Sequence, residues 1–183
     1  IKTMRYIVQL LICLLLIGCV DDPTVLKTEL SADAKQIVPY TLNEVVKWKD
    51  QKGEVYTGKV TLIKTNRYVL SSPNEVFDNE EIETNIDFGT FRFVVKQRST
   101  DDINEINYSV EYVVNDKIIH VFDLYEMPIN AFRDFIYKDV NYYNSVVLRS
   151  SGYYNSYPIL LVFSKHAGIV YVQFGEDHWF RQI

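Results

Sequence analysis

The chain has 183 residues, 48% of them apolar and 23% charged, which is typical of one folded domain and argues against disorder. Its net charge of −5 at pH 7, without a basic stripe, argues against nucleic acid as a partner, because neutralisation of phosphates drives that binding. Its 14 tyrosines and 10 phenylalanines favour strands.

Residues 1–18 have the layout of a secretory signal peptide. Lys2 and Arg5 are positive, and residues 6–17 form an apolar stretch interrupted only by Gln9. These 12 residues are too few to cross a bilayer as a helix, which needs about 20. We therefore expect this segment to be removed from the mature chain.

The apolar stretch ends in Leu16-Ile17-Gly18-Cys19, which resembles the lipobox of bacterial lipoproteins. The resemblance implies that a signal peptidase recognises Leu16, Ile17 and Gly18 and cuts before Cys19. It also implies that the thiol of Cys19 carries a diacylglycerol, and two or three acyl chains anchor a protein stably in a membrane. The plan is similar to that of small β-rich envelope lipoproteins of the Bacteroidota type.

The residues after Cys19 bear on location. Val20 stands where an aspartate implies retention in the inner membrane, so we expect the outer membrane. Asp21 and Asp22 resemble the acidic surface-export signal of Bacteroidota-type lipoproteins, which leaves periplasmic and surface-facing anchors both open. With Cys13 removed, Cys19 is the one cysteine of the mature chain, so no internal disulfide or cysteine nucleophile is expected.

Three segments follow from this reading: a signal peptide at 1–18, a lipidated N-terminus and tether at 19–39, and a single β-rich domain at 40–183. In the domain, 44–49 and 54–64 predict a hairpin, and 71–83 predicts a charged loop around Pro73. Residues 90–97 and 106–114 alternate between apolar and polar residues, as half-buried strands do. Asn115-Asp116 suits a two-residue turn, with 117–125 as the returning strand.

One amphipathic helix is expected at about 128–138. Pro128 suits a first helical position, and Ile129, Phe132, Phe135 and Ile136 recur at helical spacing. The ranges 146–149, 159–164, 169–174 and 178–182 are candidate strands, the last three forming an antiparallel meander. The predicted fold is therefore mainly β, an antiparallel sandwich or partly open barrel with one packed helix.

Candidate chemical groups are few, and we expect no cofactor, no metal site and no catalysis. If Asn115-Asp116 is a two-residue turn, Glu111 lies opposite His120, which is either a catalytic acid–base pair or a surface charge pair. His166 is expected to be solvated, and Asp177 with His178 provides too few ligands for a metal. A cluster of acids lacks the spacing of a calcium-binding loop and is expected to be solvated; it comprises Asp78, Glu80, Glu81 and Glu83.

Tyrosine, serine, asparagine and glycine are concentrated in 142–145 and 150–157, and this composition is typical of adaptable contact surfaces. The tyrosines that form this possible binding surface are Tyr142, Tyr143, Tyr153, Tyr154 and Tyr157. Packing of these tyrosines on the sheet is the alternative. We therefore expect a membrane-anchored envelope lipoprotein with a non-catalytic binding or accessory domain, whose partner is an envelope protein or a glycan. A lipid or small-ligand carrier with a barrel cavity is the alternative, followed by a hydrolase.

Overall fold

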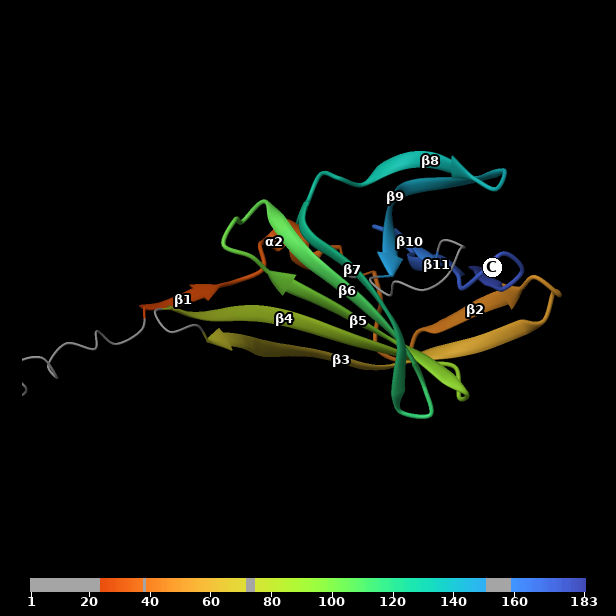
Figure 1. The fold of residues 1–183 in the computed structure, drawn as a ribbon, viewed down its shortest axis with the longest axis horizontal. Coiled ribbons are helices and arrows are strands. Elements are labelled where there is room, and N and C mark those ends of the chain that lie inside the picture. Colours follow the sequence, from red (N-terminus) through yellow and green to blue (C-terminus); the bar gives the residue numbers. More distant parts are fainter. Residues whose placement is uncertain (1–23, 38, 72–74, 151–158) are drawn as a thin grey trace, which may run out of the picture.

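The computed structural model describes residues 24–37, 39–71, 75–150 and 159–183 (Figure 1). The expected signal peptide, with Leu16, Ile17, Gly18 and Cys19, lies outside these residues. The tyrosines at 153, 154 and 157 lie outside them as well. No helix in the described part of the chain is long and apolar enough to cross a membrane.

Strands dominate the described residues, with one short helix among them. In chain order the elements are β1 (Thr24–Thr28), α2 (Ala32–Lys35), β2 (Val45–Asp50), β3 (Val55–Ser71), β4 (Glu75–Asp87), β5 (Phe91–Ser99), β6 (Glu105–Val114), β7 (Lys117–Pro128), β8 (Arg133–Tyr137), β9 (Val140–Ser150), β10 (Leu160–Ser164), β11 (Gly168–Gln173) and β12 (Trp179–Gln182).

Ten of these strands close into an antiparallel barrel, so the prediction of a mainly β fold is confirmed. The ring runs β4-β3-β2-β12-β11-β10-β9-β7-β6-β5 and returns from β5 to β4. The sheet is thus a closed barrel and neither a sandwich nor an open sheet. Among the described residues, the shortest ladder of the ring joins β7 to β9, with Phe122 paired to Ser150 and Asp123 to Arg149.

The interior is filled by alternate residues of each strand, which face inward. Phe91, Phe93 and Val95 of β5 are buried in one core cluster, as the alternation of 90–97 predicts. Ile106, Tyr108 and Val110 of β6 join the same cluster. Large aromatic side chains meet in the middle, with the ring of Trp48 5.1 Å from the rings of both Phe88 and Phe93.

The segment after β1 is part of this core, although the sequence suggested a tether up to residue 39. Ser31 caps the short helix α2 by accepting a hydrogen bond from the Ala34 N–H, and Leu30, Ala34 and Ile37 are buried in the core cluster. The side chain of Gln97 donates to the Ala34 carbonyl at 2.6 Å. The folded domain therefore begins before the expected boundary at residue 40, because these apolar side chains cover barrel core.

Beyond the barrel, β3 and β4 continue as a two-stranded arm, and β1 pairs in parallel with β4 along it (Figure 1). The charged loop expected at 71–83 is therefore wrong for its described part, since β4 begins at Glu75. Its acids lie on strand faces, where neighbouring strands and the helix α2 supply cations. The ion pairs are Asp78 with Arg67, Glu80 with Lys35, Glu81 with Arg98 and Glu83 with Lys64.

The helix expected at 128–138 is also wrong. Pro128 ends β7, and Arg133–Tyr137 form β8, which returns through Lys138 and Asp139 to β9. Both turn residues have positive φ, 47° and 60°, as a tight hairpin turn requires. The apolar residues at helical spacing are not on one face, because Ile136 is 72% exposed while Phe135 packs on Tyr142.

Candidate binding site on the outer face of the barrel

The outer face of β9–β12 is covered by a second apolar cluster, separate from the barrel interior. Leu160, Val162 and Tyr171 are buried on this face beside Tyr142. β10 is consequently buried on both faces, and all five of its residues are buried. The alternation that marks a half-buried strand is lost here because a second layer covers the barrel wall.

That second layer is the β8–β9 hairpin, which projects over β10 and β11 (Figure 1). β9 pairs with β8 from Val140 to Ser145 and with β10 from Ser145 onward. Asn144, at the change of partner, has a φ of 44°, and its N–H donates to the Asp134 side chain at 2.8 Å. The backbone thereby changes direction, and Tyr142 of the hairpin packs on the wall rather than facing solvent.

Two other tyrosines of this cluster have hydrogen-bond partners. The hydroxyls of Tyr137 and Tyr171 both donate to Oε1 of the buried Gln173, at 2.8 and 3.1 Å. Their rings are 5.7 Å apart in an edge-on contact. The hydroxyls of these two tyrosines therefore have their hydrogen-bond partners, and packing alone accounts for their position.

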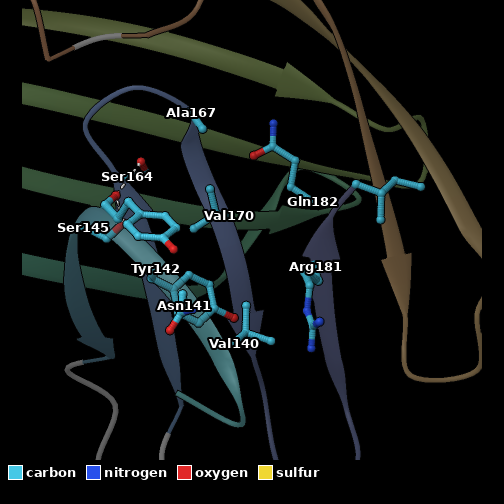
Figure 2. Close-up of a pocket in the computed structure, with 11 residues that line it drawn as sticks. Val140, Asn141, Tyr142, Ser145, Ser164, Ala167, Val170, Arg181 and Gln182 are labelled. Carbon is cyan, nitrogen blue, oxygen red and sulfur yellow. Dashed lines mark hydrogen bonds between the residues drawn. The ribbon is translucent and has the colours of Figure 1, made fainter. Parts of the chain in front are cut away.

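A pocket of about 410 Å³ opens beside these tyrosines, between the hairpin and the last strand (Figure 2). Ser145 and Ser164 lie at one side of it, Arg181 and Gln182 at the other, and Val170 lies between. The lining residues are Val140, Asn141, Tyr142, Tyr143, Ser145, Ser164, Ala167, Val170, Arg181, Gln182 and Ile183.

Two buried polar atoms of this pocket have no hydrogen-bond partner in the described part of the chain. They are the hydroxyl of Tyr142, a residue that is only 5% exposed, and Nε of Arg181. A buried polar group without a partner costs about 1–3 kcal/mol, so such groups are rare unless a water or ligand satisfies them. Both atoms belong to hydrogen-bond donors, and an acceptor bound beside them would satisfy them.

Positive charge is concentrated at the same place. Arg181 of β12 lies directly opposite Lys49 of β2, and Lys47 is two residues along on the same outer face. Within the described residues none of these three cations forms an ion pair. The guanidinium of Arg181 instead lies 5.2 Å from the centre of the Trp179 ring. Like charges opposed across a ladder destabilise it, and in a chain of net charge −5 this arrangement favours an anion.

The Tyr142 hydroxyl in the pocket remains protonated at neutral pH. Burial raises the pKa of the Tyr142 hydroxyl, and the nearby positive charge of Arg181 opposes part of this rise. Burial also raises the pKa of Tyr171. The site therefore offers one permanent cation and one neutral O–H donor, and chemically it can bind an oxyanion.

The possible binding surface of five tyrosines is placed only in part. Tyr142 and Tyr143 both line the pocket, with Tyr143 63% exposed, whereas Tyr153, Tyr154 and Tyr157 are outside the described residues. Arg181 was missed by sequence reasoning. Its signal is the alternation of Trp179 and Arg181 in the last strand, which places an aromatic ring and a cation on one outer face.

The expected pairing of Glu111 with His120 is wrong. A bulge between Tyr112 and Val113 shifts the register, so Glu111 lies opposite Val121. Glu111 binds Lys96 on the outer face, whereas His120 stacks on Phe174 at a ring distance of 5.3 Å. Successive residues of a strand face opposite sides, so the two groups cannot act together.

The other groups considered for chemistry are scattered. His166 is exposed in the turn between β10 and β11, and His178 packs 5.4 Å from the ring of Phe174. In the parts of the chain that the structure describes, no three histidine, cysteine, aspartate or glutamate side chains are arranged to hold a metal.

Comparisons of the chain with protein-family models, with curated proteins and with solved structures found no match.

Proposed function

We propose that this chain is a lipid-anchored envelope protein whose barrel is a non-catalytic binding domain, with its ligand site on the outer face of β9–β12. The observation that carries the binding role is the pair of buried, unpartnered donors, Tyr142 and Arg181, in one surface pocket. The anchor is supported by Leu16-Ile17-Gly18-Cys19 after a positive and then apolar stretch.

A closed barrel is also compatible with a carrier domain, which is the second candidate. The interior argues against a large enclosed cavity, because bulky side chains occupy it. Trp48, Phe93, Phe122 and Phe163 are all at most 1% exposed. The pocket that offers unpartnered donors lies outside the barrel, and the outer face is therefore the better-supported binding region.

Site-specific photo-crosslinking tests the binding face. A photoreactive phenylalanine analogue replaces Tyr143, which is 63% exposed and lines the pocket, and irradiation of intact cells should yield a crosslinked envelope component. The matched control is the same replacement at Tyr125, which is 68% exposed on β7 and should yield no such product. Val170→Trp fills the pocket and should abolish the product. Equal products from both positions, or no effect of Val170→Trp, would contradict the proposal.

Mass spectrometry of the protein from its native membrane tests the anchor. We expect a mature chain that begins at Cys19 and carries acyl chains, and Cys19→Ala should leave an unprocessed precursor. A lipid-free mature protein that begins at another residue would contradict the anchor. Protease treatment of intact cells then distinguishes an outer-membrane chain that faces the surface from one that faces the periplasm.

A further inference from the structure

We propose that the outer pocket binds a carboxylate of an acidic glycan, held by the guanidinium of Arg181 and the hydroxyl of Tyr142. This inference rests on the proposed binding face and names the chemistry of its ligand. Tyr142 supplies the independent sign of a ligand, since its side chain is 95% buried, lines the pocket and has no hydrogen-bond partner in the described residues.

The donor set fits a carboxylate. Arginine presents parallel N–H groups that match the two oxygens of a carboxylate, and its head here is already oriented by the ring of Trp179. Tyr142 adds a neutral O–H donor. One full positive charge with one neutral donor balances a monoanion, whereas a phosphate dianion would leave charge unbalanced inside the pocket.

The cations outside the pocket extend this site in one direction. Lys49 is the cross-strand neighbour of Arg181, about 4.8 Å away from strand to strand, and Lys47 follows about 7 Å further along β2. A polymer with a carboxylate on each sugar can meet Arg181 and one of these lysines together. A ligand with a single charge cannot.

The remaining surface suits a sugar better than a peptide. Tyr143 exposes a flat aromatic face, and Asn141 places an amide group on the pocket wall. Peptides commonly bind by adding a strand to an open sheet edge. The strands under the pocket, β10, β11 and β12, are each paired on both sides, so a peptide cannot add to them as a further strand; among the described strands, the open edge here belongs to the overlying β8–β9 hairpin.

Tryptophan fluorescence of the purified full-length chain reports on the site, because Trp179 contacts Arg181. The probe is a galacturonic acid hexamer, titrated against maltohexaose as the neutral glycan of equal length. We expect saturable binding of the hexamer and none of maltohexaose. Arg181→Gln should weaken the hexamer about tenfold or more, in line with the loss of a charge-assisted bond.

Two further variants measure how much Tyr142 and Lys49 each contribute to the affinity for the hexamer. Tyr142→Phe should weaken the hexamer by about threefold to tenfold, and Lys49→Gln by about twofold to fivefold with a lower salt dependence. The matched control is Arg92→Gln, which removes an exposed arginine paired with Asp116 at a distant hairpin and should leave binding unchanged. Circular dichroism confirms that each variant is folded.

Three outcomes would overturn the inference. Equal binding of maltohexaose would remove the role of the carboxylate. Equal binding of a hexaglutamate peptide or of inorganic phosphate would show a general oxyanion site rather than a glycan site. An unchanged affinity in Arg181→Gln would show that the hexamer is not bound by Arg181. In each case, crosslinking from position 143 that Val170→Trp abolishes would leave the proposed binding face standing.

Discussion

The hydroxyl of Tyr40 accepts a hydrogen bond of 2.6 Å from the backbone N–H of Ile169, 129 residues further along the chain. The bond ties the N-terminal segment to the interior side of β11. Gly168 makes this approach possible, because a Cβ there would lie 2.0 Å from the Tyr40 oxygen and its φ is +70°. The N-terminal segment is therefore held to the barrel by hydrogen bonding as well as by apolar packing.

Tyr40→Phe should lower the free energy of unfolding by about 1–3 kcal/mol, because the buried N–H of Ile169 loses its acceptor. Urea unfolding followed by circular dichroism measures the change. The control is Tyr125→Phe at a position that is 68% exposed. Equal unfolding midpoints for the two variants would contradict a structural role for the bond.

Ile37→Ala should cost about 2–5 kcal/mol of stability, since Ile37 is fully buried in the core cluster. Val25→Ala, in the same N-terminal segment but 54% exposed, should change stability by less than about 0.5 kcal/mol. Thermal unfolding of both variants distinguishes a folded segment from a free tether. If the segment were a tether, neither substitution would matter.

Phe135→Ala should destabilise the β8–β9 hairpin, because Phe135 stacks on Tyr142 at 5.5 Å. We expect a loss of about 1–3 kcal/mol, smaller than for a fully buried phenylalanine. Ile136→Ala should be nearly neutral, since Ile136 is 72% exposed. A packed helix at 128–138 predicts comparable losses for both, so a similar cost at position 136 would argue against the strand.

Acid should destabilise the protein partly through His120. Burial lowers the pKa of this histidine below its ordinary value of 6.5, so the unfolded chain binds its proton more readily than the folded chain. The free energy of unfolding should therefore fall as the pH falls through about 6.5 towards the lower folded pKa. His120→Phe should make the decline between about pH 7.5 and pH 5.5 shallower.

Urea titrations at several pH values measure this slope. The comparison variant is His166→Gln, an exposed turn position that leaves His120 and its packing in place. An identical slope in wild type and His120→Phe would contradict the contribution of His120.

Local alternation predicts the strands whose one face is buried and whose other face is polar. β5 and β6 are of this kind, and the turn at Asn115 and Asp116 has the positive φ values, 49° and 59°, that its residue types favour. The pairing predicted for this hairpin holds for Val114 with Lys117 and for Val113 with Ile118, and it is wrong beyond them. The bulge leaves Ile119 without a cross-strand partner, and nothing in the local pattern marks it.

The larger errors have long-range causes. β4 is rich in acidic residues, and this composition alone predicts a solvated loop. In the fold, cations of β3, β5 and α2 lie beside these acids and form ion pairs with them. Phe135 and Tyr137 are stabilised in a strand by Tyr142 and Tyr171, whose contacts override the helical spacing of their neighbours. The pocket joins positions near 140 with Arg181 because the β8–β9 hairpin packs on β10 and β11, next to β12, so composition indicates Tyr142 and Tyr143 but not their charged partner.

The parallel pairing of β1 with β4 has a mechanical consequence. Five registered positions join the strands, and β1 runs from the tip of the arm towards the barrel (Figure 1). A load applied at Thr24 and directed away from the barrel acts in shear, so the bonds of the ladder resist it together instead of breaking one after another. If the proposed acyl anchor at Cys19 and the proposed envelope polymer pull on the barrel from opposite sides, β1 should therefore stay paired with β4 under tension.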